Sequence, residues 1–153
     1  MTLLKETVET QELLEIIKEQ MEFQAAEKGN RITIDAPEGQ LVHVDMDRII
    51  QVLTNIVKNS IQFTEDGEIR LSSFSEPGST VIEVEDTGAG IDIEEIDLIW
   101  RRFFKSDVSR GSGQFGLGLS IVKQLIELHG GDIRAESEKG KGTKFIIRLP
   151  DEK

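Results

Sequence analysis

Apolar residues recur along this chain at helical spacing in three places. The first stretch covers residues 6–28 and stops at Gly29-Asn30. The second covers residues 46–63, with Asp45 where an N-cap residue belongs. The third starts at Gly116 and continues to residue 128, before a His-Gly-Gly stop. The pattern therefore predicts three amphipathic helices.

Between these helices the spacing changes to the alternation typical of strands, bounded by Pro- and Gly-containing turns. The predicted strands cover residues 31–36, 41–44, 69–73, 82–86, 132–137 and 143–149. The order is helix, two strands, helix, two strands, a long loop, helix, two strands. It predicts hairpins that pair into a sheet with helices on one face, which is an α+β, two-layer sandwich.

Composition narrows the possible functions. The 153 residues carry 18 Lys and Arg against 29 Asp and Glu, a net charge of −11, which argues against nucleic acid or an anionic membrane surface as a partner. The absence of cysteine excludes disulfides, thiolate metal sites and thiol nucleophiles. No apolar run approaches the length of a membrane span, so we expect one folded domain in the cytoplasm, or the cytoplasmic part of a membrane-anchored protein.

The strand at 82–86 ends in an acid on its core side, because Asp86 shares parity with Ile82 and Val84. A buried carboxylate needs hydrogen-bond donors. It could cap the strand before the Gly88 turn, or accept a hydrogen bond from the amino group of adenine while Gly88 and Gly90 let the backbone approach the ring.

The polar face of the helix at 46–63 carries amides without carboxylates, including Asn55 and Asn59 one turn apart. Such a stripe could simply face water. Alternatively, a neutral amide oxygen could complete a magnesium shell in which phosphates supply the negative charge.

A glycine-rich run then leads into the third helix, where free N–H groups and the helix dipole favour a phosphate. Gly111, Gly113 and Gly116 fit G-x-G-x-x-G, but no strand precedes them, so a dinucleotide fold is not indicated. Four basic residues come just before this run and could either close over an anion or face solvent. They are Arg101, Arg102, Lys105 and Arg110.

The sequence closely resembles the catalytic ATP-binding domain of bacterial sensor histidine kinases, in the GHKL superfamily of ATPases and kinases. The resemblance is carried by four segments in order: the Asn-rich helix at 46–63, the DTGAGI segment at 86–91, the aromatic and basic residues at 99–105, and the GLGL helix start at 116–119. The resemblance covers residues 25–150. It implies a mixed five-stranded sheet backed by three helices, with ATP or ADP and Mg²⁺ under a flexible lid. Residues 1–24 would then be a helix or linker from an upstream dimerisation region, and residues 25–153 the catalytic domain.

The resemblance also implies roles for individual residues. Asn55, Arg102 and Lys105 would be catalytic on the phosphate side, and Asn59 would ligate magnesium. The implied nucleotide contacts are Asn59, Gln62, Phe63, Asp86, Gly88, Gly90, Ile91, Gly116, Leu117, Gly118, Leu119 and Thr143.

Some positions depart from the family pattern. Gln62 stands where the family commonly has a phosphate-contacting lysine, which predicts weaker nucleotide affinity. Gln114 and Phe115 replace the usual Gly-Thr, which predicts a less pliable lid, and Lys105 replaces a common arginine.

The resemblance implies transfer of the γ-phosphoryl group of ATP to a histidine on a separate dimerisation domain, and a downstream response regulator as an indirect partner. We expect structural roles for His43 and His129, because neither has the helical His-Glu or His-Asp context of an acceptor. The isolated domain is expected to be monomeric and the full-length protein a homodimer. Two alternatives stay open: a nucleotide-poor protein-interaction module, and an ATPase fragment of the wider superfamily.

Overall fold

The computed structural model describes residues 2–101 and 116–151 and nothing outside them. Within these ranges the chain forms three helices and seven strands. In chain order they are β1 (Lys5–Glu9), α1 (Thr10–Glu27), β2 (Arg31–Asp35), β3 (Leu41–Asp45), α2 (Met46–Gln62), β4 (Glu68–Glu76), β5 (Ser79–Asp86), α3 (Gly116–Leu128), β6 (Asp132–Glu138) and β7 (Gly142–Pro150).

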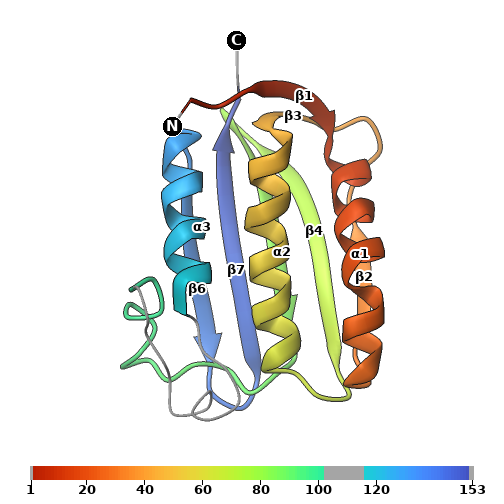
Figure 1. Ribbon diagram of the computed structural model, residues 1–153, viewed down its shortest axis with the longest axis vertical. Helices are drawn as coiled ribbons and strands as arrows, with labels where there is room; N and C mark the ends of the chain where they lie inside the picture. The colour runs from red at the N-terminus through yellow and green to blue at the C-terminus, as the bar shows by residue number, and fades with distance from the viewer. Residues whose placement is uncertain (1, 102–115, 152–153) are drawn as a thin grey trace.

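The main sheet has five strands in the order β2-β4-β5-β7-β6. Only the β2–β4 pair is parallel, and the other pairs are antiparallel, so the sheet is mixed. All three helices of the described chain lie on one face of this sheet, with α2 between α1 and α3 (Figure 1). The predicted α+β sandwich with a mixed five-stranded sheet is confirmed.

The start of the chain differs from the prediction. Residues 5–9 form β1, which pairs antiparallel with β3 in a separate two-stranded sheet, and α1 begins only at Thr10. Because β3 pairs with β1, it does not form the expected hairpin with β2. The helix prediction was wrong here because helically spaced apolar residues start only at Leu13, while Thr7 and Val8 are β-branched and favour a strand.

One hydrophobic core joins the helices to the sheet. From α1 it receives Leu13, Leu14 and Ile17, all fully buried. Burying each such side chain contributes about 1.5–3 kcal/mol relative to leaving it exposed. Residues 10–24 therefore pack into the same core as the rest of the described chain. The origin of this segment in an upstream dimerisation region stays a prediction.

Helix α2 begins as its sequence predicts. The Oδ1 atom of Asp45 accepts a hydrogen bond from the backbone N–H of Arg48 at 3.2 Å, so Asp45 is the N-cap. Its Oδ2 atom accepts the N–H of Leu4 at 2.9 Å, which fastens the segment before β1 to the start of α2. These hydrogen bonds, that of Leu4 first, lower the pKa of the Asp45 carboxyl.

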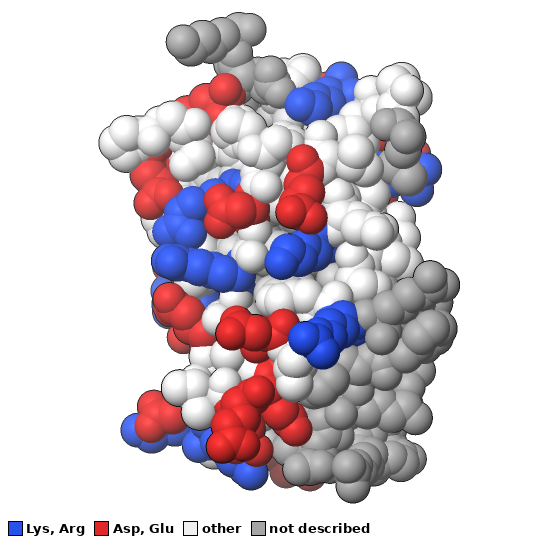
Figure 2. Space-filling view, turned by 90° about the vertical axis from the view of Figure 1, so that its left-hand side faces the viewer, with Lys and Arg blue, Asp and Glu red and all other residues white. Residues whose placement is uncertain are grey.

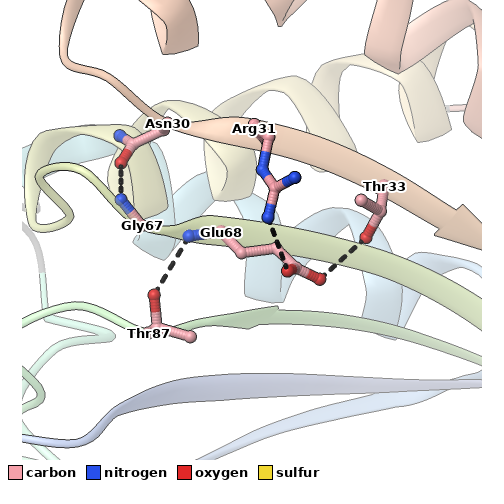
Figure 3. A network of polar contacts seen from close by, with 6 residues as sticks. All are labelled: Asn30, Arg31, Thr33, Gly67, Glu68 and Thr87. Atoms are coloured by element: carbon pink, nitrogen blue, oxygen red, sulfur yellow. Dashed lines mark hydrogen bonds and ion pairs between the residues drawn. The ribbon is translucent and has the colours of Figure 1, made fainter.

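Asn30 holds the loop after α2 through hydrogen bonds, one of which Figure 3 shows. It is almost completely buried. Its Nδ2 atom donates to the carbonyl oxygen of Thr64 at 2.8 Å, and its Oδ1 atom accepts the N–H of Gly67 at 3.0 Å. On the next residue, the N–H of Glu68 donates to Thr87 Oγ1 at 3.0 Å. Asn30 thus connects the end of α1 to the loop that leads from α2 into the sheet.

No helix within residues 2–101 and 116–151 is both long enough and apolar enough to cross a membrane.

Candidate functional site

Asp86 is the last residue of β5, and only 5% of its surface is exposed. As its parity predicts, it faces the core side of the sheet. Its Oδ1 atom accepts two backbone N–H groups, from Gly88 at 2.9 Å and from Thr143 at 3.2 Å. Thr143 is also its register partner on β7, so two segments far apart in the sequence hold one carboxylate oxygen.

Two hydroxyl groups, of Ser60 on α2 and Thr64 just after it, lie beside the same carboxylate. Burial raises the pKa of Asp86, and the N–H of Gly88, the two hydroxyls and the N–H of Thr143 act in the opposite direction. Both side chains are fully buried, but neither hydroxyl has a partner at ordinary hydrogen-bond geometry. Buried polar groups without a partner are uncommon in native proteins, so this site has hydrogen-bonding capacity that the described residues do not use.

The turn after β5 packs directly on the end of α2. The N–H of Ala89 donates to the carbonyl oxygen of Phe63 at 2.9 Å. A Cβ atom on Gly88 would collide with that same oxygen and with the hydroxyl of Thr64. Gly88 is therefore required by close packing, which is a more specific reason than the backbone approach to a ring expected from the sequence.

The connection between β6 and β7 lies against the same turn. Gly142 has φ +125°, and a Cβ atom there would collide with the backbone oxygen of Asp86. Ser137 Oγ donates to the carbonyl oxygen of Gly142 at 2.8 Å and accepts the N–H of Ile91 at 2.7 Å. Gly90, with φ +75°, packs on the backbone of Glu138. The predicted residues Gly90, Ile91 and Thr143 are thus brought together around Asp86.

One of the two asparagines of α2, Asn55, lies beside the start of α3. Asn59 is buried, with 8% of its surface exposed, and Asn55 is half-buried. A Cβ atom on Gly118 would lie 4.0 Å from the side chain of Asn55. Gly116 and Leu117 are the first residues of α3, and Leu119 is buried in the core. Asn55 of the amide stripe and the predicted start of α3 are therefore neighbours.

A cavity of about 460 Å³ opens where α1, α2 and the turn after β5 meet. It is lined by Lys28, Gln62, Phe63, Glu65, Thr87, Gly88 and Ala89. The Nζ atom of Lys28 donates to the carbonyl oxygen of Gln62 at 2.6 Å. Lys28 was not expected at the site, because it belongs to the end of α1, 34 residues before Gln62. No local sequence signal marks that contact.

Ser60 and Thr64 were also not expected from the sequence. A signal was available for Ser60, which falls on the apolar face of α2 between the core residues Val57 and Ile61. A hydroxyl on a core-facing position needs a partner, so it marks either a packing compromise or a site.

Trp100 lies at the end of the first described range. Its ring meets the buried ring of Phe145 edge-on, at 6.0 Å between centroids and 81° between planes. The Nζ atom of Lys123 on α3 lies 5.9 Å from the centroid of the same indole. Trp100 therefore packs between β7 and α3, just before the expected lid.

Several predicted site residues lie outside the described ranges. They are Arg102, Lys105, Arg110, Gly111, Gly113, Gln114 and Phe115. Arg101 is described and exposed. The expected lid therefore falls almost wholly outside the part of the chain that can be described.

The side chains of the described site could bind magnesium only together with oxygen atoms of a bound nucleotide and of water. In the described part of the chain no group of three or more His, Cys, Asp or Glu side chains could hold a metal ion. Magnesium prefers octahedral oxygen ligation and keeps waters and substrate phosphates in its shell. Asn59 could supply one neutral oxygen, with nucleotide phosphates and water completing the shell.

Acidic and basic side chains are interspersed on the side of the protein formed by α3 and β6. Figure 2 shows acidic and basic side chains alternating over the described part of this side. The pairs Arg134–Glu136 and Lys141–Glu138 contribute to it, at 3.9 Å and 3.4 Å. The net charge of −11 therefore does not form one acidic patch here.

Similarity to known proteins defines the class to which the chain belongs. Residues 44–153 match the family of histidine kinase-, DNA gyrase B- and HSP90-like ATPases, and the chain belongs to this family.

Among its relatives is the sensor histidine kinase YclK of Bacillus subtilis (strain 168). It is 53% identical over 152 residues, which cover 97% of this chain and 32% of YclK. The sensor protein SrrB of Staphylococcus aureus is 40% identical over 141 residues, covering 90% of this chain and 24% of SrrB. The chain thus spans about a third or less of the length of these curated relatives.

Solved structures show the same fold. The nucleotide-free catalytic domain of the histidine kinase ThkA aligns with a TM-score of 0.85 at 28% identity, covering 97% of both chains. Full-length ShkA in complex with AMPPNP aligns with a TM-score of 0.87 at 29% identity, covering 98% of this chain and 32% of ShkA. ThkA in complex with the response regulator TrrA aligns with a TM-score of 0.81 at 26% identity, covering 97% of this chain and 42% of that one.

Proposed function

We propose that this chain is the catalytic domain of a sensor histidine kinase, which binds ATP with Mg²⁺ and donates the γ-phosphoryl group to a histidine on a separate dimerisation domain. The observation that carries the proposal is the buried carboxylate of Asp86. Two backbone N–H groups donate to its Oδ1 atom, and the site contains two buried hydroxyls, of Ser60 and Thr64, that have no hydrogen-bond partner among the described residues. A carboxylate arranged in this way can accept a hydrogen bond from the amino group of adenine.

In this proposal the phosphates lie between α2 and the start of α3. Asn55 faces Gly118 there, and the free N–H groups and dipole at the start of α3 favour an anion. Asn59 supplies one oxygen to magnesium, which neutralises phosphate charge when it is bound. Arg102, Lys105, Gln62, Phe63, Gly116, Leu117 and Leu119 complete the proposed contacts. The AMPPNP complex of ShkA supports a triphosphate as the ligand.

The proposed partners follow from the family. The acceptor histidine belongs to the protein's own dimerisation domain, and the response regulator then receives the phosphoryl group, as the ThkA–TrrA complex suggests. His43 and His129 are not proposed as acceptors, because both are engaged in contacts within the fold. The whole protein is proposed to be a homodimer with this domain in the cytoplasm.

Calorimetric titration with ATP tests the binding proposal. Asp86→Ala should abolish measurable binding, whereas Asp35→Ala, an exposed acid paired with Arg70 at the far edge of the sheet, should leave affinity unchanged. Unchanged affinity in Asp86→Ala would refute the adenine assignment. Wild-type protein that binds no nucleotide at millimolar concentration would instead favour a protein-interaction module, consistent with the missing positive charge at Gln62.

Asn59→Ala tests the magnesium assignment. Titrations with and without Mg²⁺ should show that the wild type gains affinity from the metal and that the variant loses this gain while keeping its metal-free affinity. Phosphoryl transfer is tested by adding the dimerisation domain with ATP and looking for acid-labile phosphate on histidine. Hydrolysis of ATP without such phosphate would favour an ATPase of the wider superfamily.

A further inference from the structure

The hydroxyl group of Ser137, on β6, uses its full hydrogen-bonding capacity within the fold. It donates to the carbonyl oxygen of Gly142 at 2.8 Å and accepts the backbone N–H of Ile91 at 2.7 Å. Its oxygen also lies 3.0 Å from Thr143 Oγ1, and because its own hydrogen is given to Gly142, Thr143 is the donor in that contact. One half-buried side chain thus joins the turn after β5 to the start of β7.

These two segments are the ones that hold the carboxylate of Asp86. The N–H groups of Gly88 in the turn and of Thr143 in β7 both donate to Asp86 Oδ1, at 2.9 Å and 3.2 Å. Ser137 contacts Thr143 directly, and it binds Ile91 three residues after Gly88. The direction of the carboxylate, and with it the direction of its second oxygen, therefore depends on the relative placement of two segments that Ser137 joins.

Two further contacts join the connection between β6 and β7 to the same turn. The N–H of Gly140 donates to the carbonyl oxygen of Ala89 at 2.6 Å, and Lys139 Nζ lies 3.2 Å from Asp92 Oδ2. The ion pair is exposed to solvent, where such pairs contribute little. The serine hydroxyl is the contact that also reaches a donor of Asp86.

The placement of the carboxylate matters because purine bases differ in where they carry hydrogens. Adenine has an amino group at C6, whereas guanine has a carbonyl oxygen there and its amino group at C2. A carboxylate accepts a hydrogen bond from an amino group and repels a carbonyl oxygen. It can still accept a hydrogen bond from guanine if the base shifts to present its C2 amino group. Discrimination between the two bases therefore requires a carboxylate that is held in one position.

We propose that Ser137 is a positioning residue that sets the preference of this site for adenine over guanine. It acts through the residues that it holds, which are Ile91 in the turn and Thr143, the donor to Asp86. It need not touch the nucleotide. The preference for adenine rests on the proposed function, whereas the coupling of Ser137 to Thr143 belongs to the free protein.

The coupling is tested first without nucleotide, by NMR measurement of hydrogen exchange at individual backbone amides. In Ser137→Ala the N–H of Ile91 loses its acceptor and should exchange faster. The N–H of Thr143 keeps its acceptor, Asp86, but should also exchange faster, by about fivefold or more, because β7 is no longer tied to the turn. The amide of Thr10, which is bonded outside this site, reports any change in overall stability. A Thr143 rate that is unchanged relative to Thr10 overturns the inference.

The second experiment compares the affinities for ADP and GDP, each with magnesium, by calorimetry. The wild type should prefer ADP, and Ser137→Ala should reduce the ratio of the two affinities by about fivefold or more. Because both nucleotides bind the same folded population, a loss of stability lowers both affinities equally and leaves the ratio unchanged. Ser73→Ala is the matched control, since Ser73 is a buried strand serine whose hydroxyl donates to Gln40, outside this site, at 2.7 Å. It should leave the ratio at the wild-type value.

Three results of this comparison would overturn the inference: a wild type that binds ADP and GDP equally, an unchanged ratio in Ser137→Ala, and an equal fall of the ratio in Ser73→Ala. If the Thr143 amide exchanges faster in Ser137→Ala but no form of the protein binds either nucleotide, the coupling stands and the proposed function fails.

Discussion

His129, at the end of α3, accepts a hydrogen bond on Nε2 from the backbone N–H of Asp45, 84 residues earlier, at 3.1 Å. Its Nδ1 atom lies 2.7 Å from the carbonyl oxygen of Leu125, which can only accept, so Nδ1 carries the hydrogen. The imidazole is buried, with 3% of its surface exposed. One side chain thus joins the last turn of α3 to the N-cap of α2.

Replacing His129 should therefore destabilise the fold. His129→Ala leaves the Asp45 N–H without its partner, leaves the Leu125 carbonyl with only the backbone N–H of residue 129, and opens a cavity, so we expect a loss of about 2–3 kcal/mol in the free energy of unfolding. His43 is the matched control: it is partly exposed and lies 3.3 Å from Thr7 Oγ1, and His43→Ala should cost less than about 0.5 kcal/mol. Urea unfolding measures both, and similar losses would contradict the assignment.

Asp86→Asn should stabilise the free protein at neutral pH. Because burial raises the pKa of Asp86 in the folded state, the folded protein holds its proton more tightly than the unfolded chain. Ionising Asp86 therefore costs stability as pH rises through the folded-state pKa. Asparagine keeps the Oδ1 acceptor and removes that cost, so its advantage should shrink as pH falls toward 3.8, the ordinary pKa of an Asp side chain. Urea unfolding across pH checks this, and a loss of stability at pH 7 would contradict it.

Gly88 and Gly118 should respond oppositely to alanine. Gly88→Ala forces a Cβ atom against the carbonyl oxygen of Phe63, so the turn must move away from the end of α2. We expect this change to lower the free energy of unfolding by about 1–3 kcal/mol. Gly118 lies inside α3, and among the described residues its Cβ would meet only Asn55, at an ordinary 4.0 Å. Gly118→Ala should gain up to about 1 kcal/mol from helix propensity. Thermal unfolding distinguishes them, and losses in both would show that α3 also needs a bare backbone.

Asn30→Asp should destabilise the folded protein strongly, although the two side chains have nearly the same shape. The substitution replaces the Nδ2 donor by an oxygen that faces the carbonyl of Thr64, while the contact with the Gly67 N–H is kept. A buried repulsive contact of this kind should cost about 2–3 kcal/mol. Thr33→Ala, which removes a part-buried hydrogen bond to Glu68 on the neighbouring strand, should cost no more than about 1 kcal/mol. Equal losses on urea unfolding would contradict a special role for Asn30.

The sequence predicted those parts of the fold that depend on local periodicity. The bounds of α2, the Asp45 cap and the inward-facing Asp86 follow from neighbouring residues alone. Residues 6–9 were wrongly assigned to a helix because the strand that they form depends on β3, more than 30 residues away. A five-residue segment beside a long helix carries too little pattern to reveal such a partner.

The residues of the candidate site also fall into those that local sequence predicts and those that it does not. Asp86 and Thr143 were singled out by motif, and the structure brings them within hydrogen-bond distance. Their roles toward a nucleotide stay predictions. Lys28, Ser60 and Thr64 were missed because what distinguishes them, a cavity wall or a missing hydrogen bond, exists only once distant segments are packed together.

Trp100 also determines how the protein can be observed. It is the only tryptophan, and the chain has no tyrosine, so almost all near-ultraviolet emission comes from one indole. That indole is held against Phe145 and near the ammonium group of Lys123, where its emission depends on how α3 sits on the sheet. The unmodified protein thus contains a single optical reporter at the junction of α3 and β7, and no attached dye is needed to follow that junction in solution.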